Sequence, residues 1–369
     1  MCVPSGVYVV YEGGLCMGWE GCVCIFIHTY LNCWKPPLTY LPYILQCAPS
    51  PSSCSPSSPS PLIIWHGLGD TSTNPALQSL ADKYTTIYPD ASTHIISLSP
   101  DASSDRTSTF FGHVPTQLSQ VCTALLALPP PFATSRLNLL GLSQGGQFLR
   151  ALVQTCPFPR PPANLITFGG QHTGISKFLP SCAPSDWTCK SAGALLDRNK
   201  WSSWVQHNIV PAQYFRDPAD LDTYLEHSEF LADVNNERPL KNDTYKERLV
   251  RLDRFVMYLF EDDKTVFPKE SSWFDDVDGA TGLPVKLRNS SIYTEDWLGL
   301  KELDDKGALI FKTTPGEHMT LSDEMIHDAF KMYFAPLNNN GKEGGVDLDN
   351  YSKVILSPEK EKEEEEEEL

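Results

Sequence analysis

The sequence predicts an α/β fold in which a mainly parallel central sheet is flanked by helices. Between residues 61 and 336, apolar strand-like runs alternate with helical patterns, as in chains that wind βα units into one sheet. Most of these runs are continuously apolar, which indicates strands buried on both faces. With 369 residues, 41% of them apolar, the chain is long enough to bury a sizeable core.

Six strands are predicted in this region. They cover Pro61–Gly67, Thr93–Leu98, Leu137–Ser143, Asn164–Gly170, Arg254–Phe260 and Ala308–Thr313. Helical patterns lie between them, for example at Thr116–Leu128 and Gly146–Cys156. A longer segment, about residues 171–252, separates the fourth strand from the fifth, and we expect it to form a helical, cap-like insertion.

The two ends of the chain differ in composition from the region between them. Residues 1–60 hold seven of the eleven cysteines, show no steady period of 2 or 3.6 residues, and end in a Ser- and Pro-rich linker. They are interpreted as a leader that is either disordered or an atypical secretory signal. Residues 337–369, with 11 acidic and 4 basic residues, are predicted to be a disordered acidic tail.

The charge balance excludes one class of function. Asp and Glu number 46 against 29 Lys and Arg, for a formal net charge of −17, whereas a nucleic-acid binder needs clustered cations. The most apolar uncharged run of the leader, Gly21 to Trp34, is too short to span a bilayer. We therefore expect neither a nucleic-acid partner nor a transmembrane segment.

The sharpest local pattern is Gly141-Leu142-Ser143-Gln144-Gly145, which lies where an apolar run gives way to a helical pattern. In a strand–turn–helix of this kind the serine occupies a strained turn, and the small residues let helix and strand approach closely. The alternative is a glycine-rich turn with an ordinary helix-capping serine. The first interpretation makes Ser143 a nucleophile that needs a histidine base and an orienting carboxylate.

His318 is the candidate base among nine histidines. In this arrangement the acid and then the base follow the serine along the chain, and His318 lies after the last predicted strand and the breaker Pro315-Gly316. The following Thr320-Leu321-Ser322-Asp323 is close to a capping box and predicts a helix start. The alternative is a loop histidine with no role.

The acid is expected at the end of another strand. Arg254–Phe260 runs directly into Glu261, Asp262 and Asp263. Spacing alone does not choose among these three carboxylates, and the alternative is that all three form a charged, solvated turn.

An oxyanion hole requires two backbone N–H groups aimed at the developing negative charge. One belongs to Gln144, the residue after the nucleophile. The other is assigned to Leu68, which lies between two glycines in the loop after the first predicted strand. An ordinary turn is the alternative for that loop.

Taken together, these residues resemble the palmitoyl-protein thioesterase family of α/β-hydrolases over essentially all of residues 61–336. The matching segments are Pro61 to Asp70, Gly141 to Arg150, Gly169 to His172, Phe230 to Asp233, Tyr293 to Leu300 and Gly316 to His318. The resemblance implies the α/β-hydrolase fold, with Ser143 as nucleophile and His318 as base. Registering Val266 and Pro268 with the family's Val-x-Pro places its catalytic aspartate on Asp263.

The resemblance also implies covalent features and a location. It pairs Cys122 with Cys156 and Cys182 with Cys189, whereas the alternative is four reduced thiols in a cytosolic protein. Glycosylation candidates are Asn242, which matches an acceptor position of the family, and Asn289. Because the family is lysosomal, a lysosomal, vacuolar or secreted location is expected.

The implied function is removal of long-chain (palmitoyl) groups from S-acylated cysteines of proteins or peptides, through an acyl-serine intermediate and with no metal or cofactor. The alternatives are a lipase or carboxylesterase that cleaves oxygen esters, and a catalytically silent hydrolase fold that binds lipid. Large apolar residues of the insertion are candidates for an acyl groove, although each one taken singly is better explained as ordinary core. They are Phe178, Trp187, Trp201, Trp204, Phe230 and Leu231.

Overall fold

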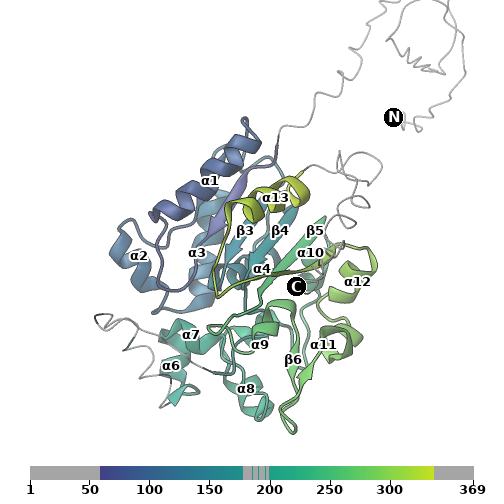
Figure 1. The fold of residues 1–369 in the computed structure, drawn as a ribbon. Helices are drawn as coiled ribbons and strands as arrows, with labels where there is room; N and C mark the ends of the chain where they lie inside the picture. Colours follow the sequence, from purple (N-terminus) through teal and green to yellow (C-terminus); the bar gives the residue numbers. More distant parts are fainter. Residues whose placement is uncertain (1–58, 178–184, 186–189, 191–195, 197–198, 336–369) are drawn as a thin grey trace, which may run out of the picture. The chain divides into compact units, whose positions relative to one another are not determined.

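A six-stranded parallel sheet forms the centre of the fold. The structure is a computed structural model, and it describes residues 59–177, 185, 190, 196 and 199–335. Its strand order is β2-β1-β3-β4-β5-β8, and every neighbouring pair is parallel. The strands are β1 (Leu62–Trp65), β2 (Thr93–Ile95), β3 (Asn138–Leu142), β4 (Asn164–Phe168), β5 (Arg254–Phe260) and β8 (Leu309–Thr314). The six predicted strands and the predicted α/β class are confirmed (Figure 1).

The apolar runs of the sequence correspond to the central strands. Every residue of β1, β3, β4 and β5 is buried, as expected where helices cover both faces of a parallel sheet. The edge strands β2 and β8 are only partly buried, because each has a neighbour on one side alone.

Helices cover the sheet on both faces (Figure 1). On one face, α1 (Pro75–Ile87) and α13 (Asp323–Tyr333) pack their apolar sides against β1, β3, β4 and β5. On the other, α3 (Val114–Leu126), α4 (Gln144–Thr155) and α10 (Asp243–Leu249) form the second part of the core. The two predicted helices are α3 and α4, and each begins two residues earlier than predicted.

The start of α13 corrects one expectation. The capping pattern placed the helix start at Thr320, but the structure has Ser322 as N-cap, with its side chain accepting a hydrogen bond from the Met325 N–H. The backbone N–H of Thr320 instead donates to the Glu317 carbonyl at 3.0 Å and closes a turn. Because this turn carries His318, the helix begins only after it.

The segment between β4 and β5 is helical in its described part, as predicted. It contains α6 (Ser203–Asn208), α7 (Val210–Gln213), α8 (Leu221–His227), α9 (Leu231–Val234) and α10. Shorter elements complete the chain: α2 (Ala102–Ser108), η1 (Lys269–Trp273), β6 (Asp276–Val277), β7 (Pro284–Val285), η2 (Leu287–Asn289), α11 (Ser291–Thr294) and α12 (Leu300–Asp305). Among the described residues, no helix has the length and apolar content needed to cross a membrane.

A buried arginine of α4 connects the segment between β4 and β5 to the helices that cover the sheet. The guanidinium of Arg150 donates to the Asn235 side-chain oxygen at 2.7 Å, to the Val234 carbonyl at 3.3 Å and to the His172 carbonyl at 3.2 Å. Its other partner is the side-chain oxygen of Gln154, at 2.9 Å. Replacing this fully buried arginine by an apolar residue would leave its acceptor atoms without these hydrogen bonds.

The groove candidates of the insertion differ in burial. Phe230 and Leu231 are buried in the core, where Phe230 packs edge-on against Phe148 at 5.6 Å. Trp201 packs against the same core, whereas Trp204 is 58% exposed. The first two are therefore ordinary core, as the alternative interpretation held. The remaining two candidates, Phe178 and Trp187, lie outside the described residues.

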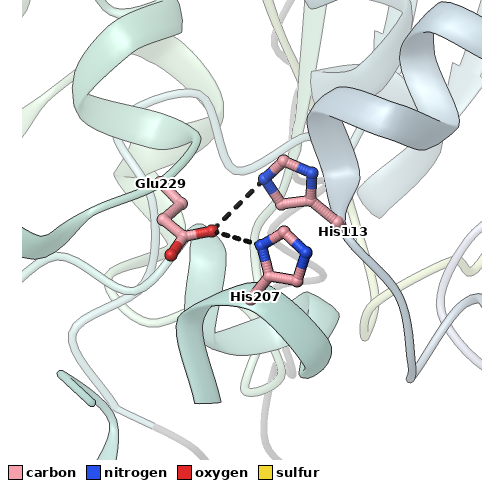
Figure 2. Close-up of side chains that lie close together, drawn as sticks. All are labelled: His113, His207 and Glu229. Atoms are coloured by element: carbon pink, nitrogen blue, oxygen red, sulfur yellow. Dashed lines mark hydrogen bonds and ion pairs between the residues drawn. The ribbon is translucent and has the colours of Figure 1, made fainter. Parts of the chain in front are cut away.

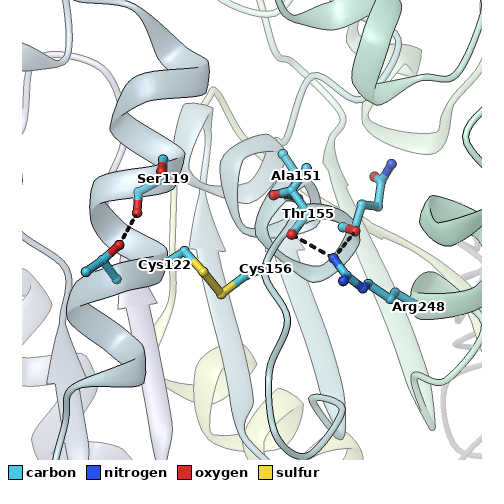
Figure 3. Close-up of a disulfide and its surroundings, with 8 residues drawn as sticks. Ser119, Cys122, Ala151, Thr155, Cys156 and Arg248 are labelled. Carbon is cyan, nitrogen blue, oxygen red and sulfur yellow. Dashed lines mark hydrogen bonds between the residues drawn. A yellow bond between two sulfur atoms is a disulfide. The ribbon is translucent and has the colours of Figure 1, made fainter.

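A disulfide joins Cys122 of α3 to Cys156 at the end of α4, as the resemblance implied (Figure 3). Beside it, Arg248 of α10 donates to the carbonyls of Gln154 and Thr155, at 3.0 and 2.6 Å. The three helices of this face are thus connected by one covalent bond and two hydrogen bonds. The second predicted pair, Cys182 and Cys189, lies outside the described residues and stays a prediction.

Candidate active site

Three side chains expected to act together meet at one edge of the sheet. Ser143 follows β3, Asp263 lies just beyond β5, and His318 lies just beyond β8. The carboxyl ends of parallel strands share an edge, so the sheet brings these residues together from distant parts of the chain. His318 Nε2 is 2.8 Å from Ser143 Oγ, and His318 Nδ1 is 2.6 Å from Asp263 Oδ2.

Ser143 has the strained backbone that the sequence pattern predicts. Its φ is 51° and its ψ is −122°, a conformation that costs a non-glycine residue about 1–3 kcal/mol. A Cβ on Gly141 would lie 2.3 Å from Gly146 Cα, and one on Gly145 would lie 2.2 Å from the Trp65 carbonyl oxygen. Ser143 occupies the N-cap position of α4 without a capping bond from its side chain, which is bonded to the histidine instead.

Burial distinguishes Asp263 from the other two carboxylates. Only 1% of its side chain is exposed. Its Oδ1 accepts hydrogen bonds from the N–H groups of Thr265 and Val266, at 2.8 and 3.0 Å, which leaves Oδ2 to the histidine. The preceding carboxylates are exposed: Glu261 and Asp262. The position that the resemblance implied for the acid is therefore the one in contact with His318.

Gly169 makes room for the histidine ring, a role that the sequence analysis did not identify. It follows β4 with a φ of +61°, and a Cβ there would lie 2.8 Å from His318 Cε1. The ring of Phe260 flanks the imidazole edge-on at 5.8 Å. The signal in the sequence was the pair Gly169-Gly170 directly after an apolar strand.

The loop after β1 passes directly beside the nucleophile. A Cβ on Gly67 would lie 3.1 Å from the Cβ of Ser143. Among the described residues, no acceptor is hydrogen-bonded to the backbone N–H of Leu68 or of Gln144. Both donors are thus free to bind an oxyanion, and their assignment stays a prediction.

Residues of α2 and its C-terminal end hold this loop in place. The Gly69 N–H donates to Oγ1 of Thr109 at 2.8 Å, and Nε of Arg106 donates to the Gly69 carbonyl at 2.9 Å. The Thr109 carbonyl also accepts from the side-chain amide of Gln144 at 3.3 Å. One segment therefore supports both sides of the expected oxyanion hole.

A second His–Asp pair is buried beneath the loop. His66 Nε2 lies 3.5 Å from Oδ2 of Asp105, and neither side chain is exposed. The Asp105 carboxylate accepts from the backbone N–H groups of Ser72 and Leu98, each at 2.8 Å. Burial alone would raise the pKa of Asp105, but the contact with His66 and these two bonds outweigh it and hold that pKa well below its usual value. His66 precedes Ser143 along the chain, whereas the base of the expected arrangement follows the serine.

His172 is, like His66, a fully buried histidine. Its ring stacks on Phe274 at 4.7 Å, and Nε2 lies 3.1 Å from Oγ1 of Thr167. Burial, and to a lesser extent the charge of Arg150, lower the pKa of His172 well below its usual value, so the ring is neutral.

Comparison with known proteins identifies the family to which this chain is similar. Residues 61–318 match the family described as palmitoyl protein thioesterase. Palmitoyl-protein thioesterase 1 of Caenorhabditis elegans is 34% identical over 279 residues, which are 74% of this chain and 91% of that protein. Palmitoyl-protein thioesterase 3 of Dictyostelium discoideum is 33% identical over 75% of this chain and 90% of its own length. Lysosomal thioesterase PPT2 of Rattus norvegicus is 28% identical over 79% and 92%.

These matches bear directly on the prediction made from the sequence. The match to the family covers most of the chain, and the relatives from Caenorhabditis elegans and Dictyostelium discoideum, both above 30% identity, are covered almost over their full length. The prediction of a thioesterase is confirmed, and the chain belongs to the palmitoyl-protein thioesterase family.

Proposed function

We propose that this chain hydrolyses the thioester of S-acylated cysteines in proteins or peptides and releases a long-chain fatty acid. The observation that carries the proposal is the bonded set Ser143, His318 and Asp263, with the serine on a strained turn at the sheet edge. Family membership supports the substrate class. A catalytically silent lipid-binding fold has no need of this arrangement.

In the first half of the reaction, Ser143 Oγ attacks the thioester carbonyl carbon while its proton passes to His318 Nε2. His318 Nδ1–H donates to Asp263 Oδ2, which holds the ring in position and stabilises its charged form. The N–H groups of Leu68 and Gln144 bind the oxyanion. The carbon–sulfur bond then breaks and leaves an acyl-serine.

The leaving group is a cysteine thiolate, with a reference pKa of about 8.5. It therefore needs less proton donation from His318 than an alkoxide would. The proton that His318 took from Ser143 passes to the departing sulfur, which leaves the ring neutral. In the second half, His318 takes a proton from a water molecule as the water oxygen attacks the acyl-serine carbonyl. His318 then returns this proton to Ser143 Oγ as the acyl–oxygen bond breaks and the fatty acid leaves.

Two exposed apolar side chains belong to the loops that carry site residues and are suited to an acyl chain. Leu68, in the oxyanion loop, is 40% exposed, and Phe267, four residues after Asp263, is 37% exposed. Each methylene that an acyl chain buries contributes about 0.8 kcal/mol. We expect Phe267→Ala to raise KM for a palmitoyl substrate more than for a butanoyl substrate, with kcat for the short chain preserved.

The compartment forms part of the proposal. The Cys122–Cys156 disulfide favours an oxidising environment, and the two candidate acceptors Asn242 and Asn289 are exposed. A relative of 28% identity is named a lysosomal thioesterase. We propose a lysosomal, vacuolar or secreted location, which sequencing of the mature N-terminus and treatment with a glycosidase would test.

The decisive experiment compares two esters of equal chain length. An S-palmitoyl peptide should be cleaved faster than the matching oxygen ester, and Ser143→Ala should abolish both activities. The matched control is Ser119→Ala, which removes an exposed serine of α3 and should leave both rates unchanged. Faster cleavage of the oxygen ester would favour a lipase or carboxylesterase.

Labelling with a serine-directed fluorophosphonate separates an enzyme from a silent fold. We expect wild type and Ser119→Ala to be labelled and Ser143→Ala to be unlabelled. Absence of labelling in folded wild-type protein would contradict the proposed nucleophile.

A further inference from the structure

Two histidines and a glutamate converge where the insertion meets the hydrolase core. His113 lies at the start of α3, His207 lies in α6, and Glu229 lies between α8 and α9. Oε2 of Glu229 is 3.0 Å from Nδ1 of His207 and 3.3 Å from Nε2 of His113. Figure 2 shows the carboxylate facing both rings, which are carried by different elements.

These separations match those of ligand atoms around a small divalent ion. Four-coordinate Zn²⁺ takes histidine nitrogen at about 2.0–2.1 Å and carboxylate oxygen at about 2.0–2.2 Å. Two such ligands at a tetrahedral angle are about 3.3–3.5 Å apart. One ligand atom from each of the three residues can be chosen so that all lie within 4.8 Å of one another.

The second ring nitrogen of His113 already has a partner. Nδ1 lies 2.8 Å from Oγ1 of Thr116, three residues further along α3. When Nδ1–H donates to this hydroxyl, the lone pair is on Nε2, which is the nitrogen that faces Glu229. Metal-bound histidines are commonly oriented by such an outer hydrogen bond from the other ring nitrogen.

Access and mobility at the cluster also suit an ion. The side chains of His113 and Glu229 are 22% and 29% exposed, so the protein holds both in place. The side chain of His207 is 59% exposed, and its ring stacks on that of His113 at 4.2 Å. The exposed ring can turn to direct a nitrogen at an ion, and solvent can reach the remaining coordination position.

We propose that His113, His207 and Glu229 bind a divalent transition-metal ion of the zinc type, with water as the fourth ligand. Imidazole and carboxylate together suit Zn²⁺ and its neighbours in the first transition row. The site shares no residue with the triad, so the ion takes no part in acyl transfer. The proposal therefore stands independently of the proposed function.

An ion here would connect the insertion to the support of the oxyanion loop. Next to the cluster, Phe111 forms a β-bridge with Ile209, and the Gly112 N–H donates to the Asn208 carbonyl at 2.9 Å. Thr109, which bonds the oxyanion loop, lies two residues before this bridge. Three metal–ligand bonds would add to the hydrogen bonds that hold the two parts together at this point.

The test is a calorimetric titration of Zn²⁺ into the metal-free full chain, with free thiols blocked by iodoacetamide. We expect wild type to bind one Zn²⁺ ion. The affinity of Glu229→Gln and of His113→Gln for this ion should each be at least about 100-fold lower than that of wild type. Thr116→Val, which removes only the outer hydrogen bond, should weaken binding by about 10-fold. The matched control is His327→Gln, which removes an exposed histidine beside a carboxylate on α13 and should change nothing.

Thermal unfolding provides a second readout. Zn²⁺ should raise the Tm of wild type and His327→Gln, and not that of Glu229→Gln, provided all three fold in its absence. Absence of binding to wild type would overturn the proposal. Equal affinity and stoichiometry in wild type, His113→Gln and Glu229→Gln would also overturn it, because the ion would then be bound elsewhere. Thioesterase activity is not a readout here, so failure of this proposal and of the proposed function are distinguishable.

Discussion

Nδ1 of His318 lies 2.6 Å from Oδ2 of Asp263, whose other oxygen accepts two backbone N–H bonds. These two backbone hydrogen bonds hold the Asp263 carboxylate in position, independently of its contact with the imidazole. An amide at this position would present an N–H to Nδ1 and favour the tautomer that places hydrogen on Nε2, facing the serine.

Asp263→Asn should therefore lower kcat by about 10⁴-fold while the protein remains folded. The control is Asp262→Asn, because this neighbouring carboxylate is exposed and lies outside the triad. Steady-state hydrolysis of an S-palmitoyl peptide checks both variants, with circular dichroism to confirm folding. A loss of similar size in Asp262→Asn would contradict the assignment of the acid.

Gly169→Ala should lower kcat by about 100-fold. The added Cβ would lie 2.8 Å from His318 Cε1, and a misplacement of about 1 Å in a catalytic group costs a factor of that order. Gly307→Ala is a matched control, since Gly307 also has a positive φ but an added Cβ there meets nothing within 4 Å. Both variants should lose some stability, and only Gly169→Ala should lose activity. Full activity in Gly169→Ala would show that the ring tolerates the displacement.

Asp105→Asn should lower the free energy of unfolding by about 1–3 kcal/mol. The carboxylate accepts the N–H groups of Ser72 and Leu98, and the amide nitrogen of asparagine would leave one of these buried donors without an acceptor. Urea denaturation measures the loss. Asp82→Asn, on the exposed side of α1, should change stability by less than about 0.5 kcal/mol. Equal stabilities of the two variants would mean that the buried pair does not hold the loop.

The double variant Cys122→Ser/Cys156→Ser should lose about 2–4 kcal/mol of stability and keep its activity at ambient temperature. The bridge closes a loop with a sequence separation of 34 and shares no residue with the triad. The midpoint of guanidinium denaturation checks the first part and hydrolysis of the S-palmitoyl peptide the second. An unchanged midpoint would contradict a stabilising role for the bridge.

His172 should make the protein less stable as the pH falls. Its folded-state pKa is depressed by burial and by Arg150, so below the unfolded-state pKa of about 6.5 the unfolded chain binds a proton that the folded chain does not. The loss begins near that pH and approaches about 1.4 kcal/mol per pH unit as the pH falls toward the folded-state pKa. His172→Gln should remove this slope in urea denaturation measured from pH 7 to pH 5. An identical pH dependence in the variant would show that another group is responsible.

The sequence predicted the strands and the turn at Ser143 because each of them is marked by a pattern of neighbouring residues. Continuous apolar runs marked the six strands, and the glycines around Ser143 marked the turn, because close contact between helix and strand excludes a side chain there. The choice of Asp263 over Glu261 and Asp262 depended on the resemblance, since all three follow the same strand and only tertiary burial separates them.

Other features depend on contacts between residues far apart in the chain. The pairing of His66 with Asp105 and the cluster of His113, His207 and Glu229 join segments that no local pattern connects. The expectation that the chain needs no metal rested on the chemistry of the triad alone. It did not include this cluster, because its three residues lie far apart in the sequence. The start of α13 at Ser322 was missed because a turn that carries His318 delays the helix.

The strands β4 and β5 are hydrogen-bonded neighbours, with Phe168 opposite Tyr258, although the whole insertion lies between them in sequence. The nucleophile, the acid and the base all follow strands outside that segment. The segment between β4 and β5 can therefore change in length and shape while the spacing of the reacting groups stays set by the sheet. Exchanging this segment between members of the family would change the surroundings of the site and leave the strands that carry the reacting groups in place.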